Sequence, residues 1–110
     1  MNLVADEAGG ARVVRVGDER IDASVAIQFK DRMRELGSGA GPRLILDMGR
    51  VGFVDSSGLG AIVAVMKFLA PGCRLELAAL TPTVAKVFRM TRMDTVFAIH
   101  AEAPAPAHGA

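Results

Sequence analysis

The most informative segment of this chain is "RLILDMGRVGFVDSSGLGAIVAVMKFL", residues 43–69. Its first six residues, "RLILDM", contain a continuous apolar run at residues 44–46, which is typical of a strand buried on both faces. After the short loop "GRVGF", residues 56–69 predict a helix that is apolar nearly all round, and such a helix must be covered on more than one side. Between strand and helix stands the pentad "DSSGL", residues 55–59. The presence of two adjacent serine hydroxyls between an apolar strand and an apolar helix needs a physical explanation.

The residues before this segment predict two strands and a helix. The β-branched run "ARVVRVG", residues 11–17, predicts a strand, and "NLV" near the start is a candidate to pair with it. A helix is expected to begin at Asp22, because its carboxylate is a good N-cap. The apolar stripe of this helix comprises Val25, Phe29, Met33 and Leu36. The glycine-rich stretch "GSGAGP", residues 37–42, then ends the helix.

The residues after the segment continue the alternation of strands and helices. "CRLELAAL", residues 73–80, predicts a strand in which Leu75 and Leu77 alternate with Arg74 and Glu76. Thr81-Pro82 predicts the next helix start, with Val84, Val87, Phe88 and Thr91 on its buried side. "TVFAI", residues 95–99, predicts a last short strand, and "AEAPAPAHGA", residues 101–110, a disordered tail.

The resulting order β-β-α-β-α-β-α-β predicts an α/β fold with a mixed sheet of four to five strands and helices packed on it. At 110 residues the chain fits one domain, which we expect over residues 1–100.

Composition argues against several classes of function. Thirteen basic and twelve acidic residues nearly cancel and aromatic residues are few, so we expect no nucleic-acid partner. Cys73 is the single cysteine, which excludes an intramolecular disulfide and a cysteine metal cluster; no metal or cofactor is expected. "MNLVADEAGG" lacks the features of a signal peptide. Charged and hydroxyl side chains interrupt the apolar run of residues 51–70, so we expect a cytoplasmic protein without membrane insertion.

The tandem serines do not fit an enzyme or a nucleotide site. A nucleophile elbow needs glycine two residues before the serine, where Val54 and Asp55 stand. His100 is the one histidine expected to be ordered, and nothing in the sequence brings it close as a base. "GSGAG" precedes a strand instead of linking a strand to a helix, so we interpret it as a flexible turn. We therefore expect no enzymatic activity.

Helix capping explains one of the two serines at most. Either Asp55 or Ser56 is a natural N-cap. Gly58 and Gly60 in the first turns of a helix cost about 1 kcal/mol each relative to alanine, which suggests that something approaches the backbone closely there. A serine exposed at a helix N-terminus also suits a phosphoacceptor, because the phosphate charge would lie at the positive end of the helix.

The segment "LILDMGRVGFVDSSGLGAIVAVMKFL" closely resembles the signature of the STAS-domain anti-sigma factor antagonists, in which Asp-Ser-Ser-Gly-Leu-Gly opens a helix after an apolar strand. The resemblance covers residues 3–99 and implies the STAS fold. It further implies a partner-switching regulator that binds an anti-sigma factor serine kinase when unphosphorylated and thereby frees a sigma factor. The kinase would use ATP as its own substrate, and a PP2C-type phosphatase would reverse the modification.

Carried over by position, the resemblance makes Ser56 the phosphorylated residue and places Ser57, Gly58, Leu59 and Gly60 on the docking surface around it. Asp22 matches the aspartate that lies near the acceptor serine and contacts the kinase. We expect the partner-binding residues to be Asp22, Asp55, Ser57, Gly58, Leu59, Gly60, Ile62 and Val63, with Met66 a further candidate for an apolar outer patch. Ser56 is expected to expose its hydroxyl, and Ser57 to turn inward or to satisfy local backbone groups.

Two other interpretations stay open. STAS domains also serve as adaptor subunits of lipid-transporting ABC complexes, which need no phosphorylatable serine. The simplest alternative is a stable α/β domain whose serines only cap a helix.

Overall fold

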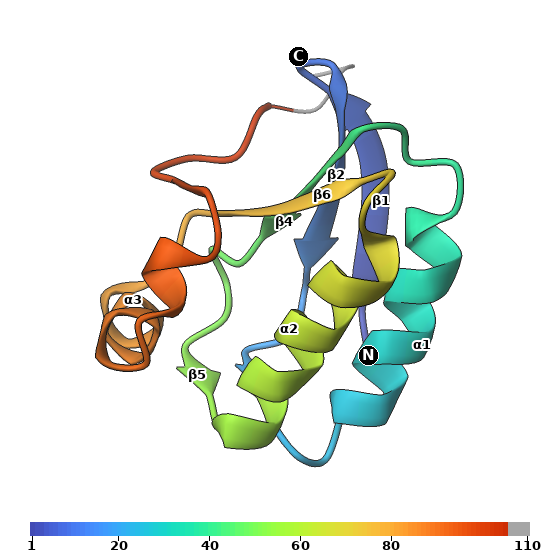
Figure 1. Ribbon diagram of the computed structural model, residues 1–110. Coiled ribbons are helices and arrows are strands. Elements are labelled where there is room, and N and C mark those ends of the chain that lie inside the picture. Colours follow the sequence, from blue (N-terminus) through green and yellow to red (C-terminus); the bar gives the residue numbers. More distant parts are fainter. Residues whose placement is uncertain (106–110) are drawn as a thin grey trace.

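The computed structural model describes residues 1–105 and contains a five-stranded mixed sheet with helices packed on it (Figure 1). The strands lie in the order β1-β2-β4-β6-β7. β1 is antiparallel to β2, and the other neighbours are parallel. The bounds are Leu3–Ala8 for β1, Ala11–Val16 for β2, Arg43–Asp47 for β4, Arg74–Ala78 for β6 and Ile99–His100 for β7. The predicted fold class and the order of its main elements are confirmed.

The helices are α1, Ala26–Gly37; α2, Ser56–Leu69; and α3, Pro82–Met90, followed by the 3-10 helix η1, Met93–Thr95. α1 and α2 lie side by side on one face of the sheet, and α3 lies at the side of the domain, where it contacts β5 (Figure 1). Because each of α1 and α2 connects two parallel neighbouring strands, both begin at the same end of the sheet.

The main core lies between the sheet and these helices. Side chains with no exposed surface come from β4 (Leu44 and Leu46), α1 (Phe29 and Met33), α2 (Ile62 and Val65) and α3 (Val84 and Phe88). The Phe88 ring packs edge-on against Phe97 at a centroid distance of 6.0 Å. This contact holds the segment after α3 against the domain.

A second, two-stranded sheet was not predicted. β3, Arg20–Ile21, pairs in parallel with β5, Phe53–Val54. β5 lies at the end of the segment predicted as a loop. The pairing matters for the site, because it brings the residues after β3 next to the residues after β5.

The other face of the sheet carries a smaller apolar cluster formed by Ala8, Ala11, Val13, Ile45 and Ala78. Residues 101–105 contain no helix or strand, yet Ala103 packs on this cluster and the Pro104 carbonyl accepts a 3.0 Å hydrogen bond from the Arg15 guanidinium. The disordered tail was predicted over residues 101–110, of which 106–110 lie outside the described residues.

Glu76 on this face departs from the expected alternation, since its side chain is buried. Its carboxylate accepts two hydrogen bonds from the Arg43 guanidinium, at 2.9 and 3.1 Å, and lies 2.7 Å from Nε2 of His100. The predicted last strand is also shorter than expected: residues 93–95 form η1, and the strand begins only at Ile99. Among the described residues, no helix is long and apolar enough to cross a membrane.

Candidate functional site

The first turn of α2 is capped by Asp55. One carboxylate oxygen, Oδ1, accepts a 2.8 Å hydrogen bond from the Gly58 N–H, and the Asp55 carbonyl accepts one from the Leu59 N–H at 2.9 Å. A side-chain cap of this kind satisfies N–H groups that have no partner within the helix. Of the two predicted N-caps, Asp55 is the one used, and the helix does not require a serine hydroxyl.

Both serines of the pair are exposed at the first two positions of α2. No hydrogen bond found within residues 1–105 involves the hydroxyl of Ser56 or of Ser57. The expectation that Ser57 turns inward is wrong. The inward position of this turn is Gly58, and at about 100° per residue both serines point more than a right angle away from it.

Gly58 and Gly60, both in the first turns of α2, differ in how closely other atoms approach them. A methyl group on Gly58 would overlap the backbone carbonyl of Ile21 in β3, whereas a methyl group on Gly60 would meet nothing within 4 Å among the described residues. The predicted close approach to the helix is therefore real at Gly58, but the chain itself makes it. Because Gly58 is buried, its predicted contact with a partner is wrong; Gly60 is exposed and stays available.

Asp22 lies in the turn that precedes α1. Its carboxylate accepts hydrogen bonds from the Ser24 hydroxyl at 2.6 Å, the Ser24 N–H at 3.1 Å and Nε of Arg20 at 3.1 Å. The Ser24 hydroxyl and then Arg20 lower the pKa of Asp22, because these donors favour the charged carboxylate. The predicted role as helix N-cap is wrong: α1 begins at Ala26, and Asp22 closes the turn before it.

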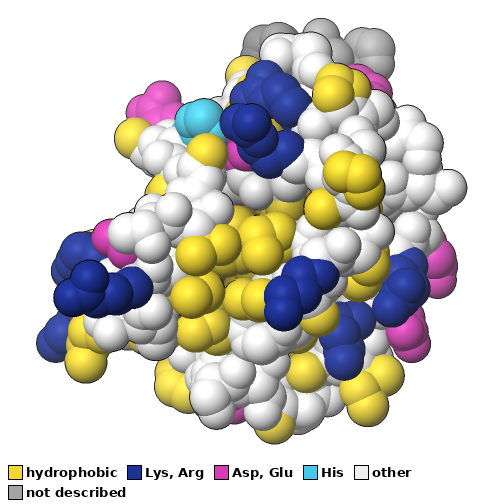
Figure 2. Space-filling view, viewed as in Figure 1, with side chains coloured by type: hydrophobic (Ala, Val, Ile, Leu, Met, Phe, Trp, Pro, Cys, Tyr) yellow, Lys and Arg dark blue, Asp and Glu magenta, His cyan; other side chains and the backbone are white. Residues whose placement is uncertain are grey.

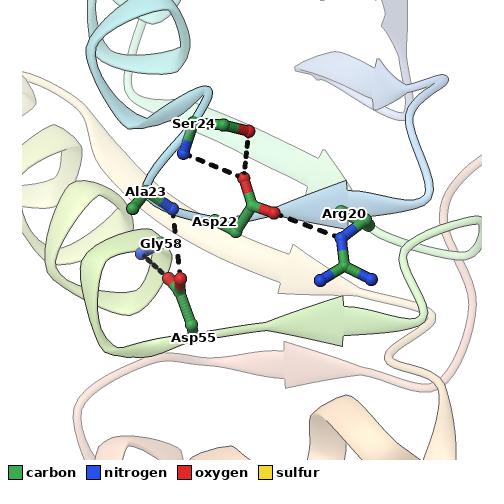
Figure 3. Close-up of polar contacts among 6 residues, drawn as sticks. All are labelled: Arg20, Asp22, Ala23, Ser24, Asp55 and Gly58. Atoms are coloured by element: carbon green, nitrogen blue, oxygen red, sulfur yellow. Dashed lines mark hydrogen bonds and ion pairs between the residues drawn. The ribbon is translucent and has the colours of Figure 1, made fainter.

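Asp55 links the Asp22 turn to α2. Its second carboxylate oxygen, Oδ2, accepts a 3.1 Å hydrogen bond from the N–H of Ala23 (Figure 3). The single carboxylate thus holds the residue after Asp22 and the first turn of α2 together. Asp22, Asp55 and the two serines therefore share one end of the domain, as the resemblance implied.

Arg20 and Phe53 form a contact that sequence analysis missed. The Arg20 guanidinium lies 4.2 Å from the centroid of the Phe53 ring, which is 38% exposed. The two residues face each other in the β3–β5 pair. Since each of these strands has two residues, no hydrophobic periodicity could have indicated the pairing.

The predicted apolar patch on α2 divides into buried and exposed parts. Ile62 has no exposed surface, so its prediction as a partner contact is wrong. It lies on the inward face of the helix with the other buried residues Gly58, Ala61 and Val65, which follow one another at helical spacing. Leu59, Val63 and Met66 are half-buried and border the core. These three keep surface for a partner.

The part of the chain described here contains no group of three or more His, Cys, Asp or Glu side chains placed to hold a metal ion.

The family model for the STAS domain matches residues 2–103. The chain belongs to the STAS domain family. A STAS domain protein from Planctomyces limnophilus, described as an anti-sigma factor antagonist, has a similar fold, with a TM-score of 0.82 and 18% identity over 92% of this chain and 91% of that one.

SpoIIAA, an anti-sigma factor antagonist, is similar in its unphosphorylated form, with a TM-score of 0.69 and 23% identity over 92% of this STAS domain and 90% of SpoIIAA. Its phosphorylated form from Bacillus matches with a TM-score of 0.62. A sulfate transporter family protein from Wolinella succinogenes also matches, with a TM-score of 0.70 and 15% identity over 82% of this chain and 75% of that one. The STAS fold therefore occurs in proteins of more than one role, and the function must be argued from the site.

Proposed function

We propose that this STAS domain is an anti-sigma factor antagonist that acts by partner switching and is switched off by phosphorylation of Ser56. In its unphosphorylated form it binds an anti-sigma factor serine kinase and frees a sigma factor. A PP2C-type phosphatase restores the binding form. ATP is a substrate of the kinase, and no catalytic step is assigned to this chain.

The observation that carries the proposal is the state of the two serines. A buried or hydrogen-bonded hydroxyl would have served the fold, but Ser56 and Ser57 are both exposed and Asp55 performs the capping. A kinase can reach such a hydroxyl without unfolding the helix. Its proximity to Asp22, which the resemblance assigns to kinase contact, supports the same surface.

The expected effect of the phosphate follows from the local charges. A phosphoserine adds about −1.5 to −2 charges at neutral pH. At residue 56 this charge would lie at the favourable end of the α2 dipole, so the fold tolerates it. The same charge would lie next to the Asp55 carboxylate, on a surface whose accessible apolar side chains include Leu59 and Val63. A partner that docks there would meet a strongly hydrated, doubly acidic surface.

The test uses the unphosphorylated protein immobilised as bait with lysate of its source bacterium. We expect a serine kinase to be retained and then released when ATP and Mg²⁺ are added. Ser56→Ala should retain the kinase after ATP addition, and Ser57→Ala should release it as the wild type does. Mass spectrometry of residues 51–67, a tryptic peptide, should find one phosphate on Ser56. Phosphate on Ser57 would reverse the assignment of the acceptor.

The same experiment can also give a result that favours the adaptor function in a lipid-transporting ABC complex over the switch. An ATPase subunit retained equally before and after ATP addition, with no phosphate on the bait, would replace the switch by an adaptor role.

A further inference from the structure

Ile27 is an apolar side chain that the fold leaves in solvent. It is the second residue of α1 and is 71% exposed. Phe29 and Met33, which pack on the sheet from the same helix, have no exposed surface. A β-branched residue is also a weaker helix former than alanine. Neither the packing of the domain nor helix propensity therefore accounts for an isoleucine at this position.

Two contacts show how α1 lies along α2. Before α1 begins, the Ala23 N–H donates a 3.1 Å hydrogen bond to the carboxylate of Asp55, the N-cap of α2. Near the end of both helices, the Arg34 guanidinium lies 4.2 Å from the centroid of the Phe68 ring. In these contacts the second residue comes 32 to 34 positions after the first, so the two helices run side by side with nearly the same offset along their length.

By this offset Ile27 lies at the level of residues 59–61 of α2. Of these three residues Gly60 alone is exposed, and a methyl group on it would meet nothing within 4 Å among the described residues. Glycine costs a helix about 1 kcal/mol relative to alanine, and the chain's own packing gives no reason for it at this position. An unexplained apolar side chain and an unexplained stretch of bare backbone are therefore neighbours on the surface.

Both residues lie close to Ser56. Hydrophobic side chains reach the surface at the end of the molecule where α1 and α2 begin (Figures 1 and 2). Gly60 lies one turn, about 6 Å, along the helix from Ser56, and neighbouring helices are about 8–10 Å apart, so Ile27 is about 11 Å from Ser56. A stable protein complex covers about 800 Å² of each partner, which corresponds to a disc of about 16 Å radius. A kinase centred on the Ser56 hydroxyl would therefore cover Ile27.

We propose that Ile27 and Gly60 form an apolar seat for the serine kinase of the proposed function, which places an apolar side chain against both. The proposal rests on that function, because the need to reach Ser56 is what brings the kinase over the seat. Binding would remove from water the apolar surface of Ile27 that folding leaves exposed. The missing side chain at Gly60 lets the partner approach the helix backbone closely.

The test uses the full-length unphosphorylated protein and the serine kinase that it retains from lysate, purified and titrated without ATP. We expect Ile27→Ala to raise the Kd by about tenfold. Ile27→Leu keeps the apolar surface and should stay within about threefold of the wild type. Gly60→Ala should also raise the Kd, because its methyl group fills the seat. The double variant should lose less than the product of the two single losses, since both changes damage one contact.

Val4→Ala is the matched control. Val4 is 56% exposed, and its register partner Arg15 contacts Pro104 on the face of the sheet opposite α1 and α2. Register partners share one face of a sheet, so this variant should bind the kinase as the wild type does. With ATP present, Ile27→Ala should raise the KM for phosphorylation of Ser56 and leave kcat unchanged, because the seat holds the kinase without touching the acceptor hydroxyl.

The outcomes separate this inference from the function on which it rests. An unchanged Kd for Ile27→Ala, with Ser56 phosphorylated as in the wild type, would overturn the seat and leave the proposed function standing. Equal losses in Ile27→Ala and Val4→Ala would overturn the seat as well, and so would a lowered urea midpoint for Ile27→Ala, because Ile27 would then support the fold. A wild type that neither retains a kinase nor becomes phosphorylated would overturn both.

Discussion

Gly58 and Gly60 offer a direct test of how the first turns of α2 are built. Both lie in the same helix, both are replaced by alanine, and the intrinsic gain in helix propensity is about 1 kcal/mol for each. The two positions differ in their surroundings. At Gly58 the new methyl group would overlap the Ile21 carbonyl, while at Gly60 it would enter open space.

The expected free energies of unfolding follow from this difference. Overpacking costs about 1–3 kcal/mol, and the upper end applies at Gly58 because the obstacle is backbone instead of a flexible side chain. After subtraction of the propensity gain, Gly58→Ala should lower the free energy of unfolding by about 2 kcal/mol. Gly60→Ala should raise it by up to about 1 kcal/mol. The two variants should therefore differ by about 3 kcal/mol.

Urea unfolding followed by circular dichroism measures this difference. With a slope of about 1.5 kcal/mol per molar urea for a domain of this size, the two midpoints should lie about 2 M apart. Equal midpoints would refute the packing of β3 against α2. Gly60→Ala should also be compared with the wild type for kinase retention: loss of binding in this stable variant would show that the partner approaches the helix backbone at residue 60.

Three further changes test the site and the sheet. Asp55→Ala removes the cap of α2 and its link to Ala23, so the free energy of unfolding measured in urea should fall by about 1–2 kcal/mol, and an unchanged midpoint would contradict the capping role. Asp22→Asn keeps a hydrogen-bond acceptor but removes the charge; we expect an almost unchanged urea midpoint and weaker kinase retention, and normal retention would reduce Asp22 to a turn residue. Arg43, opposed by burial, lowers the pKa of Glu76 from 4.5 to about 2. A lowered folded-state pKa gives stability that is present above pH 4.5 and lost as the pH falls towards 2. The wild type should therefore lose up to about 3 kcal/mol relative to Glu76→Gln over this interval, as measured by urea unfolding at each pH, and parallel pH profiles would show that the carboxylate contributes nothing.

The bounds of α2 could be predicted from the sequence because local signals agree there. Asp55 caps the start, the run up to Leu69 is apolar, and Ala70-Pro71 stops the helix, so Ser56–Leu69 was predicted and is observed. The start of α1 was missed for a related reason. Asp22 has the residue type of an N-cap, but its carboxylate is used by Ser24 and Arg20 in the preceding turn. The same side-chain chemistry serves a cap and a turn, and sequence alone does not separate them.

The features that the sequence did not indicate depend on pairing between distant residues. Glu76 alternates with leucines and was expected to face solvent. It is buried because Arg43 lies diagonally across β4 and His100 on β7, both within hydrogen-bond distance. The inward orientation of Ile62 likewise depends on which side of an almost wholly apolar helix meets the sheet. Neither fact is encoded in a local pattern.

The contacts around Ser56 limit how the proposed switch of this STAS domain could work. The first turn of α2 is held by the Asp55 carboxylate and by the close approach of Ile21 to Gly58, and the serine hydroxyls take no part. The proposed phosphorylation of Ser56 would therefore break no hydrogen bond that supports the fold. In the proposed switch the signal would act through the charge and shape of the exposed surface, and a partner would read it by direct contact with residue 56. A phosphate can also melt a segment through the charge that it adds, but at residue 56 that charge would lie at the favourable end of the α2 dipole, and the capping hydrogen bond there is made by Asp55 and not by the serine.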